Sequence, residues 1–293
     1  MQNDNSKFKI IFFGTSDFAI PALETLAKDN YDVVAVVTKP DKPAGRKQVL
    51  SPSPVKKFAI EKHILVLEPN NLRGDEEVFA AFKLLSPDVC VVAAYGKIIP
   101  KRYLGVPKYG FINIHPSLLP KYRGPSPIQT AILSGEKETG VTILVVDEEM
   151  DHGPILKSEK WKVKNGKYYK ELEKELAELG AKLLIETLPK YINGEIKQAP
   201  QDHSRATFTK MFSREDGRVD WSKSTQEIYN RIRALNPEPG TWTLWKGKVL
   251  NIKKARLADG KLEIETLQLE GKRETPFREF LNGHPDFDIS QLE

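Results

Sequence analysis

The sequence contains very little cysteine: Cys90 is the one thiol among 293 residues. A single cysteine excludes an intrachain disulfide, and neither a CxxC pair nor an HExxH motif is present to suggest a metal site. Cys90 lies in the apolar run from Val89 to Ala94, where it is expected to be a buried core residue, as free cysteines usually are. No metal cofactor is therefore expected.

Long hydrophobic runs are also absent. No stretch of about 18 apolar residues occurs, so neither a membrane span nor a membrane partner is expected. Residues 1–9 are polar and lack the apolar core of a signal peptide, which predicts a cytoplasmic location. With 40% hydrophobic and 29% charged residues, the composition is typical of a soluble globular protein with one large or two ordinary domains.

Glycine is sparse at the place where a dinucleotide-binding protein would need it. After the apolar run from Lys9 to Phe13, the chain continues Gly14-Thr-Ser-Asp-Phe18. The fingerprint of nicotinamide-cofactor sites, G-x-G-x-x-G, needs two further glycines, so such a cofactor is not expected. The net charge of +5 is small for a nucleic-acid-binding protein, and a polyanionic partner is plausible only if the positive charges are clustered.

Apolar runs alternate with helical stretches from the N-terminus to about residue 150. Continuous β-branched runs such as Val33 to Val37 are typical of strands that are buried on both faces. The alternation predicts a doubly wound α/β domain of Rossmann-like type with a mostly parallel sheet. The candidate strands are residues 9–13, 33–37, 64–67, 89–93, 111–115 and 141–146, and the candidate helices include 18–26, 76–85 and 127–133.

The pattern changes in the second half of the chain. Residues 167–192 predict a long amphipathic helix that is broken near Pro189 and ends at Gly194. Residues 195–212 are polar without clear periodicity and are expected to form a linker. Beyond a helix at 224–235, short runs on either side of Asp259-Gly260 suggest antiparallel strands. The predicted division is therefore an α/β domain at 1–194, a linker at 195–212 and a small β-rich domain at 213–293.

Two polar side chains interrupt the apolar strand from Phe111 to His115. Asn113 and His115 are two residues apart, so on a strand they point to the same face. Asp151 follows the next apolar run. An amide, an imidazole and a carboxylate at neighbouring strand ends suit acyl transfer, in which Asn113 and His115 stabilise an oxyanion and Asp151 manages the proton. These three are the candidate catalytic residues.

This constellation resembles the folate-dependent formyltransferase family over nearly the whole chain. The resemblance implies 10-formyltetrahydrofolate as the donor and direct attack by an acceptor amine, without a covalent enzyme intermediate. For residues 213–293 it implies an open β-barrel of the oligonucleotide-binding (OB-like) type. The matching motifs are Asn113-x-His115, Ser117-Leu-Leu-Pro-x-Tyr-Arg-Gly124, Gly140-Val-Thr142 and Asp151-x-Gly153-Pro-Ile155.

The resemblance also implies two stretches that bind the reduced folate. Residues 93–99 are expected to line the slot for the pterin ring, and the turn that follows the strand at 111–115 is expected to contact the same ligand. The residues implied are Ala94, Tyr95, Gly96, Ile98, Ser117, Leu118, Leu119 and Pro120.

A long basic connection runs from residue 38 to residue 57. It carries six cationic residues against Asp41, and its prolines and glycine are expected to prevent regular structure. In the family, a Pro-Ala-Gly-Arg loop at this position marks the members that act on tRNA, which implies initiator methionyl-tRNA as the acceptor. Contacts to tRNA are then expected from Lys42, Arg46 and Lys47 in this loop and from Lys253 and Lys254 in the C-terminal domain.

Three alternatives stay open. A sugar-nucleotide N-formyltransferase also carries a second β-rich domain, and a 10-formyltetrahydrofolate hydrolase would use water as the acceptor. An RNA-binding module without activity is the third, and the intact Asn113, His115 and Asp151 argue against it. The basic connection favours tRNA as the acceptor. Nothing in the sequence demands an oligomer, so a monomer is expected.

Overall fold

The computed structural model describes residues 8–29, 31–44 and 49–292. The chain forms two compact units, and each unit is assembled from three stretches of sequence. The division predicted from the sequence, at 1–194, 195–212 and 213–293, stays a prediction. Unit 1 comprises Met1–Gly124, Gly140–Trp161 and Lys174–Phe208, and unit 2 comprises Pro125–Thr139, Lys162–Glu173 and Thr209–Glu293.

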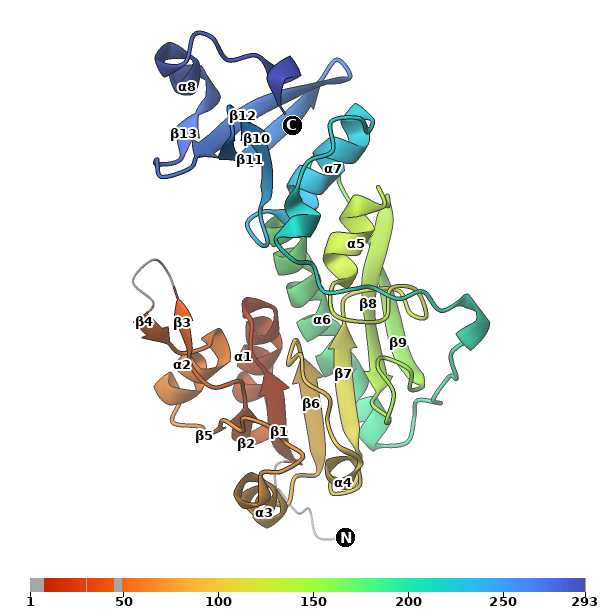
Figure 1. The fold of residues 1–293 in the computed structure, drawn as a ribbon. Helices are drawn as coiled ribbons and strands as arrows, with labels where there is room; N and C mark the ends of the chain where they lie inside the picture. The colour runs from red at the N-terminus through yellow and green to blue at the C-terminus, as the bar shows by residue number, and fades with distance from the viewer. Residues whose placement is uncertain (1–7, 30, 45–48, 293) are drawn as a thin grey trace, which may run out of the picture. The chain divides into compact units, whose positions relative to one another are not determined.

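Unit 1 is built on a seven-stranded sheet with the strand order β5-β2-β1-β6-β7-β8-β9 (Figure 1). The pairs β2–β5, β1–β2, β1–β6 and β6–β7 are parallel, whereas β7–β8 is antiparallel. The prediction of a doubly wound, mostly parallel sheet is therefore confirmed. The strands are β1 (Phe8–Gly14), β2 (Tyr31–Val37), β5 (Leu65–Leu67), β6 (Val89–Ala93), β7 (Phe111–His115), β8 (Glu138–Val145) and β9 (Ile155–Lys162).

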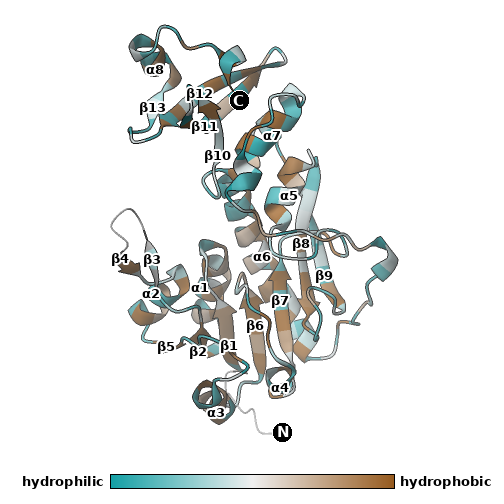
Figure 2. Ribbon diagram, viewed as in Figure 1, coloured by the Kyte–Doolittle hydropathy of each residue, from teal (hydrophilic) through white to brown (hydrophobic). Residues whose placement is uncertain are grey.

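The central strands are largely apolar because helices cover both faces of the sheet, and Asn113 and His115 of β7 are exceptions. Figure 2 shows these strands among the most hydrophobic parts of the chain. On one face, Phe82 of α3 (Glu76–Leu85) and Tyr103 of α4 (Lys101–Leu104) pack in a buried cluster with Phe111. On the other face, α6 (Tyr169–Ile192) approaches closely, since a Cβ on Gly180 would lie 2.6 Å from Cγ2 of Ile114.

Side-chain caps mark the beginning of some of the helices. Ser53 accepts a hydrogen bond from the N–H of Lys56 at the start of α2 (Pro54–Glu61), and Asp75 accepts one from Val78 at the start of α3. The remaining helices are α1 (Ile20–Lys28), α5 (Pro127–Leu133), α7 (Thr225–Leu235) and α8 (Phe277–Gly283), with short 3-10 turns at Asp17–Ala19, His203–Arg205, Glu215–Gly217 and Ile289–Gln291.

Three expectations about local structure are corrected. The predicted break near Pro189 is wrong, because α6 continues through this residue to Ile192, and a proline in the last turn removes a single N–H. The basic connection does contain regular structure: β3 (Lys42–Ala44) and β4 (Val49–Ser51) form an antiparallel pair. Strand β9 was not expected either, and its largely exposed, charged residues carry no apolar run.

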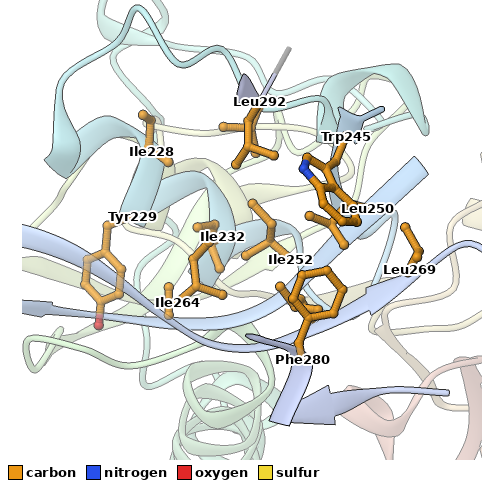
Figure 3. Packing of buried hydrophobic residues seen from close by; sticks show 13 residues of the cluster. Ile228, Tyr229, Ile232, Trp245, Leu250, Ile252, Ile264, Leu269, Phe280 and Leu292 are labelled. Atoms are coloured by element: carbon orange, nitrogen blue, oxygen red, sulfur yellow. The ribbon is translucent and has the colours of Figure 1, made fainter. Parts of the chain in front are cut away.

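Unit 2 contains a four-stranded antiparallel sheet with the order β10-β11-β12-β13, which confirms the β-rich C-terminal part. Asp259 and Gly260 form the tight turn between β11 and β12 with φ values of 49° and 75°. Helix α7 packs Ile228 and Ile232 into a core with Trp245 and Leu250 (Figure 3). The strands are β10 (Thr241–Trp245), β11 (Lys248–Ala258), β12 (Lys261–Leu269) and β13 (Thr275–Pro276).

Candidate functional site

Strand β7 delivers Asn113 and His115 to the carboxyl edge of the sheet in unit 1. Asn113 is opposite Val92 of the parallel strand β6 and Leu144 of β8, and His115 is opposite Thr142. His115 is buried, with 4% of its surface exposed, whereas Asn113 is half-buried. Both side chains therefore lie at the end of a central strand, where open α/β sheets commonly bind ligands.

Asp151 reaches the same place from the turn between β8 and β9. Its Oδ1 accepts a hydrogen bond from Nδ2 of Asn113 at 3.1 Å, and its Oδ2 accepts one from the backbone N–H of Gly124 at 2.8 Å. Asp151 has a φ of +51°, a left-handed conformation that a non-glycine residue adopts at some cost. Sequence reasoning placed the three candidate catalytic residues at neighbouring strand ends, and the structure brings them together.

The imidazole of His115 is engaged at both ring nitrogens. Nε2 lies 2.9 Å from the carbonyl oxygen of Tyr122, which can only accept, so Nε2 must carry a proton. Nδ1 lies 3.5 Å from Oδ1 of Asp151, which is close for an ion pair and long for a hydrogen bond. The Asp151 carboxylate thus lies within hydrogen-bonding distance of the Asn113 amide and slightly farther from the His115 imidazole.

Gly153 allows the turn that carries Asp151 to fold back on β8. A Cβ at this position would overlap the carbonyl oxygen of Val145, so no other residue fits without a backbone shift. The adjacent Val145 N–H donates to the carbonyl of Pro154 at 2.9 Å and fixes the other side of the turn. The Asp-x-Gly spacing of the sequence therefore has a steric origin.

The predicted folate stretch after β6 contributes backbone rather than an aromatic side chain. Ala94 and Gly96 have positive φ values of 47° and 65°, which turn the chain sharply at the strand end. Tyr95 is buried with its ring edge-on to Phe13 at 5.4 Å, and its burial raises the pKa of the phenol. Only its backbone remains for a ligand, whereas the side chain of Ile98 is 66% exposed.

The second predicted folate stretch, 117–120, is fixed against β8. Thr142 Oγ1 donates to the carbonyl of Ser117 at 2.7 Å and accepts from the N–H of Leu119 at 3.2 Å. Ser117 Oγ donates to the carbonyl of Lys121. Leu118 lies over Gly140, where an added Cβ would meet its side chain at 2.5 Å. The Ser117 carbonyl and the Leu119 N–H are thus already hydrogen-bonded to Thr142. These bonds hold the stretch from Ser117 to Pro120 in place next to His115.

The structure describes only some of the residues that were predicted to contact tRNA. Arg46 and Lys47 lie outside the described residues, and Lys42 is paired with Ser51 in the β3–β4 ladder. Lys56 of the same connection is not a free cation, because Asp41 and Glu68 each lie 2.8 Å from its Nζ and raise its pKa.

In unit 2, Lys253 and Lys254 lie on β11 at an irregularity in its pairing with β12. Lys254 is exposed, and its Nζ lies 3.4 Å from a carboxylate oxygen of Glu265. The acid beside Lys254 offsets part of the positive charge on this strand.

Several groups that hold the site were not found from the sequence. The carbonyl of Tyr122 and the N–H of Gly124 are backbone groups, which leave no signal in residue type. His152, next to Asp151, forms a hydrogen bond with Asp147 at 2.7 Å and stacks on His203 with ring centroids 4.1 Å apart. His203 comes from the segment predicted to be a linker.

Within the described ranges, no group of three or more His, Cys, Asp or Glu side chains is arranged to hold a metal ion. In the same part of the chain, no helix has both the length and the apolar character to span a membrane.

Comparison with known proteins adds a family assignment to this geometry. Residues 7–188 match the model of the formyl transferase family, and residues 211–261 match the model of the formyl transferase C-terminal domain. The methionyl-tRNA formyltransferase of Caldicellulosiruptor saccharolyticus is 42% identical over 302 aligned positions, which cover 94% of this chain and 96% of that protein.

Solved structures show the same fold. The methionyl-tRNA formyltransferase from Clostridium thermocellum superposes with a TM-score of 0.60 at 18% identity and covers 89% of this chain and 98% of its own. An N-formyltransferase from Helicobacter canadensis, in complex with folinic acid and dTDP-3-aminofucose, has a TM-score of 0.67 at 21% identity and covers 90% of this chain and 96% of its own. At such identities the likeness shows the fold alone.

Proposed function

Because the chain belongs to the methionyl-tRNA formyltransferase family, we propose that it transfers the formyl group of 10-formyltetrahydrofolate to the α-amine of methionine on initiator tRNA. The observation that carries the proposal is the contact of Asn113 and His115 with the Asp151 carboxylate at the carboxyl edge of the sheet. An amide, an imidazole and a carboxylate converge there, as direct acyl transfer to an amine requires.

The reaction replaces one carbon–nitrogen bond by another. The free α-amine attacks the formyl carbon, a tetrahedral oxyanion forms, and the bond from that carbon to N10 of the folate breaks. One proton must leave the attacking nitrogen and one must reach N10. Asp151 is the proton acceptor in this scheme, because its carboxylate lies beside both proposed oxyanion donors and its side chain is 13% exposed. No enzyme nucleophile is needed.

Oxyanion stabilisation is assigned to Asn113 and His115. Asn113 uses one amide N–H on Asp151, and its second N–H is the donor proposed for the oxyanion. His115 keeps its Nε2 proton on the carbonyl of Tyr122, so the donor to the oxyanion is a second proton on Nδ1, which faces the Asp151 carboxylate. The hydrogen bond to Tyr122 fixes the plane of the ring, and a fixed donor costs no reorganisation during the reaction.

The folate is placed along two turns that end adjacent parallel strands. The turn at 94–96 presents backbone through its two positive φ values, and exposed Ile98 offers apolar surface to a flat ring. The rigid segment at 117–120 faces the same strand edge, and its contacts with Thr142 keep it in place. Ala94, Tyr95, Gly96, Ile98, Ser117, Leu118, Leu119 and Pro120 remain the proposed folate-binding residues.

The acceptor tRNA is proposed to contact two cationic regions. Lys42, Arg46 and Lys47 belong to the connection between β2 and α2, and Lys253 and Lys254 belong to β11. Charged initiator tRNA is a cytoplasmic substrate, so the reaction is placed in the cytoplasm, with the protein acting as a monomer.

An acceptor assay tests the proposal directly. The purified full-length chain is given 10-formyltetrahydrofolate together with charged initiator tRNA, a nucleotide-linked amino sugar, or buffer alone. Formylated methionyl-tRNA is the expected product, with little folate turnover in the other two reactions. Preferential formylation of the sugar would replace the tRNA acceptor by a sugar nucleotide, and equal turnover in buffer would make the protein a hydrolase.

A further inference from the structure

Gln201 is a buried side chain of the segment predicted to be a linker, and it contacts the backbone on both sides of His152. Its Nε2 donates to the carbonyl of Asp151 at 2.9 Å and to the carbonyl of Gly153 at 2.7 Å. Only 6% of Gln201 is exposed. Both amide hydrogens are therefore donated to backbone carbonyls of the turn that carries the Asp151 carboxylate.

The other end of the same amide is held by Arg123. Oε1 of Gln201 accepts from Nε of Arg123 at 3.2 Å and from its Nη2 at 2.7 Å. Arg123 is itself buried, with 4% of its surface exposed, and its Nη2 also lies 2.8 Å from Nδ1 of His203. The guanidinium can only donate and the two carbonyls can only accept, so the orientation of the Gln201 amide is unambiguous.

Arg123 lies between the two residues that hold the catalytic side chains. The carbonyl of Tyr122 holds His115, and the N–H of Gly124 holds the Asp151 carboxylate. Through its side chain, Arg123 then reaches Gln201, which holds the Asp151 backbone. These contacts close a ring that fixes the two loops of the site against each other.

Gln201 is well placed to do this because its own segment is anchored on both sides. Ala199 forms a backbone bridge with Ile155, with N–O distances of 2.8 and 2.9 Å. Further along, the N–H of Arg123 donates to the carbonyl of Thr207 at 2.8 Å. The segment thus acts as a rigid strut rather than as a loose connection.

Resting on the catalytic role proposed for Asp151, we propose that Gln201 is a positioning residue for this carboxylate. Asp151 holds a left-handed backbone conformation, which costs free energy for a residue that has a Cβ atom. Two hydrogen bonds from Gln201 offset that cost and set the direction of the carboxylate. A displacement of about 1 Å at a reacting group can cost about 10²-fold in rate, so Gln201 controls kcat and leaves substrate affinity largely unchanged.

A double-mutant cycle separates this role from simple support of the fold. The variants are Gln201→Ala, Asp151→Asn and the pair together, with exposed Gln198→Ala on the same segment as the matched control. Gln201→Ala is expected to lower kcat at least about tenfold with both KM values within about threefold, whereas Gln198→Ala matches the parent. In the Asp151→Asn background, loss of Gln201 is expected to change kcat less than about twofold, because coupled residues are not additive.

Gln201→Glu is the second variant, and it keeps the size of the side chain. Its carboxylate can still accept from Arg123 but offers no hydrogens to the carbonyls of Asp151 and Gly153, so kcat is expected to fall as it does in Gln201→Ala. Lowering the pH protonates the introduced carboxylate and restores one donor. The ratio of kcat for this variant to that of the parent should therefore rise toward acid pH, a response that lost packing would not produce.

Each outcome bears on one proposal. A parent-like kcat in Gln201→Glu would overturn the positioning role, and this test remains if Gln201→Ala fails to fold. An equal loss of kcat from Gln201→Ala in the parent and in the Asp151→Asn background would also overturn it. Parent-like kcat in Asp151→Asn would instead overturn the catalytic role of the carboxylate. Near-ultraviolet circular dichroism of every variant confirms that the compared proteins are folded.

Discussion

Nδ1 of His115 lies 3.5 Å from Oδ1 of Asp151, and the same carboxylate oxygen accepts the amide hydrogen bond of Asn113 at 3.1 Å. One oxygen atom therefore links both proposed oxyanion donors. A change in this carboxylate alters the charge next to the imidazole and the direction of the Asn113 amide at once. The three side chains are expected to behave as a unit when they are replaced.

The first prediction concerns that unit. Asn113→Ala, His115→Ala and Asp151→Ala are each expected to reduce kcat about 10²-fold or more, because each removes a group that acts on developing charge or on the proton. The double variants are expected to lose little beyond the worse single variant. Steady-state kinetics with native circular dichroism checks this, and near-normal turnover in any folded single variant would remove that residue from the mechanism.

The second prediction concerns ligand choice. Gly14 is the last residue of β1, and a Cβ there would lie 2.7 Å from Phe12 and 2.9 Å from Ala19, so this glycine serves close packing. Acidic Asp17 opens the next turn, and the remaining glycines of a dinucleotide fingerprint are absent. Calorimetric titration of the full-length chain is expected to show binding of folinic acid and none of NADH. Tight NADH binding would reopen the assignment of the site.

Much of the unit 1 sheet could be predicted because its strands are buried on both faces. The strand at 111–115 and the helices at 76–85 and 127–133 have the predicted bounds. Strand β9 was not predicted because it lies at the edge of the sheet, where its charged residues are exposed to solvent and give no apolar pattern. The grouping of α5 with unit 2 was not predicted either, since residue type does not show which neighbour a helix packs against.

The candidate site could be predicted only as far as its side chains share a strand. The spacing of Asn113 and His115 places them on one face, and the Asp-x-Gly motif marks a tight turn. The contacts of Tyr122, Gly124 and Gln201 could not be inferred. Two of these use backbone atoms, and the third joins residues that are 50 positions apart in a stretch without periodicity.

The third prediction concerns Gly153. Replacement by alanine forces a Cβ into the carbonyl of Val145 and to 3.5 Å from the N–H of Asp147. Gly153→Ala is expected to lower the free energy of unfolding by about 1–3 kcal/mol, as overpacking typically does, and to lower kcat by moving Asp151. Gly74→Ala is the control, because nothing lies within 4 Å of its Cβ position. Chemical denaturation and kcat are measured, and equal behaviour of the two variants would contradict the steric account.

The fourth prediction concerns the pH dependence of stability in unit 2. The Lys210 ammonium, together with hydrogen bonds from Ser213, lowers the pKa of Asp216 from 3.8 to about 2. A carboxyl group whose pKa is lower in the folded state stabilises the fold above its unfolded pKa, and this contribution is lost as the pH falls through the folded value. The stabilisation is therefore complete above about pH 5 and disappears between about pH 4 and pH 2.

Asp216→Asn tests this relation. The difference in unfolding free energy between the parent and this variant is expected to be largest near neutral pH and to shrink toward pH 2. Asp32→Asn, at an exposed position, is the control and should show little difference at either pH. Urea titrations at several pH values measure both. A difference that is independent of pH would show that the charge of Asp216 is not what stabilises this turn.

The last prediction concerns tRNA recognition. Arg46 belongs to the connection whose base is fixed by the ion pairs of Lys56 with Asp41 and Glu68. Arg46 is one of the tRNA-binding residues proposed for this connection, so its replacement by alanine is expected to remove one contact to the tRNA. Arg46→Ala is expected to lower kcat/KM for charged initiator tRNA at least about tenfold, equivalent to about 1.4 kcal/mol, with KM for the folate unchanged.

Salt dependence separates phosphate contacts from indirect effects. Each lost contact to a phosphate is expected to reduce the slope of log affinity against log salt by about one unit. Replacing Lys253 and Lys254 together by alanine should weaken tRNA binding and reduce this slope. The reduction should be smaller than the two units expected for two phosphate contacts, because Glu265 already lies 3.4 Å from Lys254. Exposed Lys28, on α1, is the control for loss of one positive charge. If Arg46→Ala formylates initiator tRNA as the parent does, the loop is not the tRNA contact, and an amino-sugar acceptor must be tested in its place.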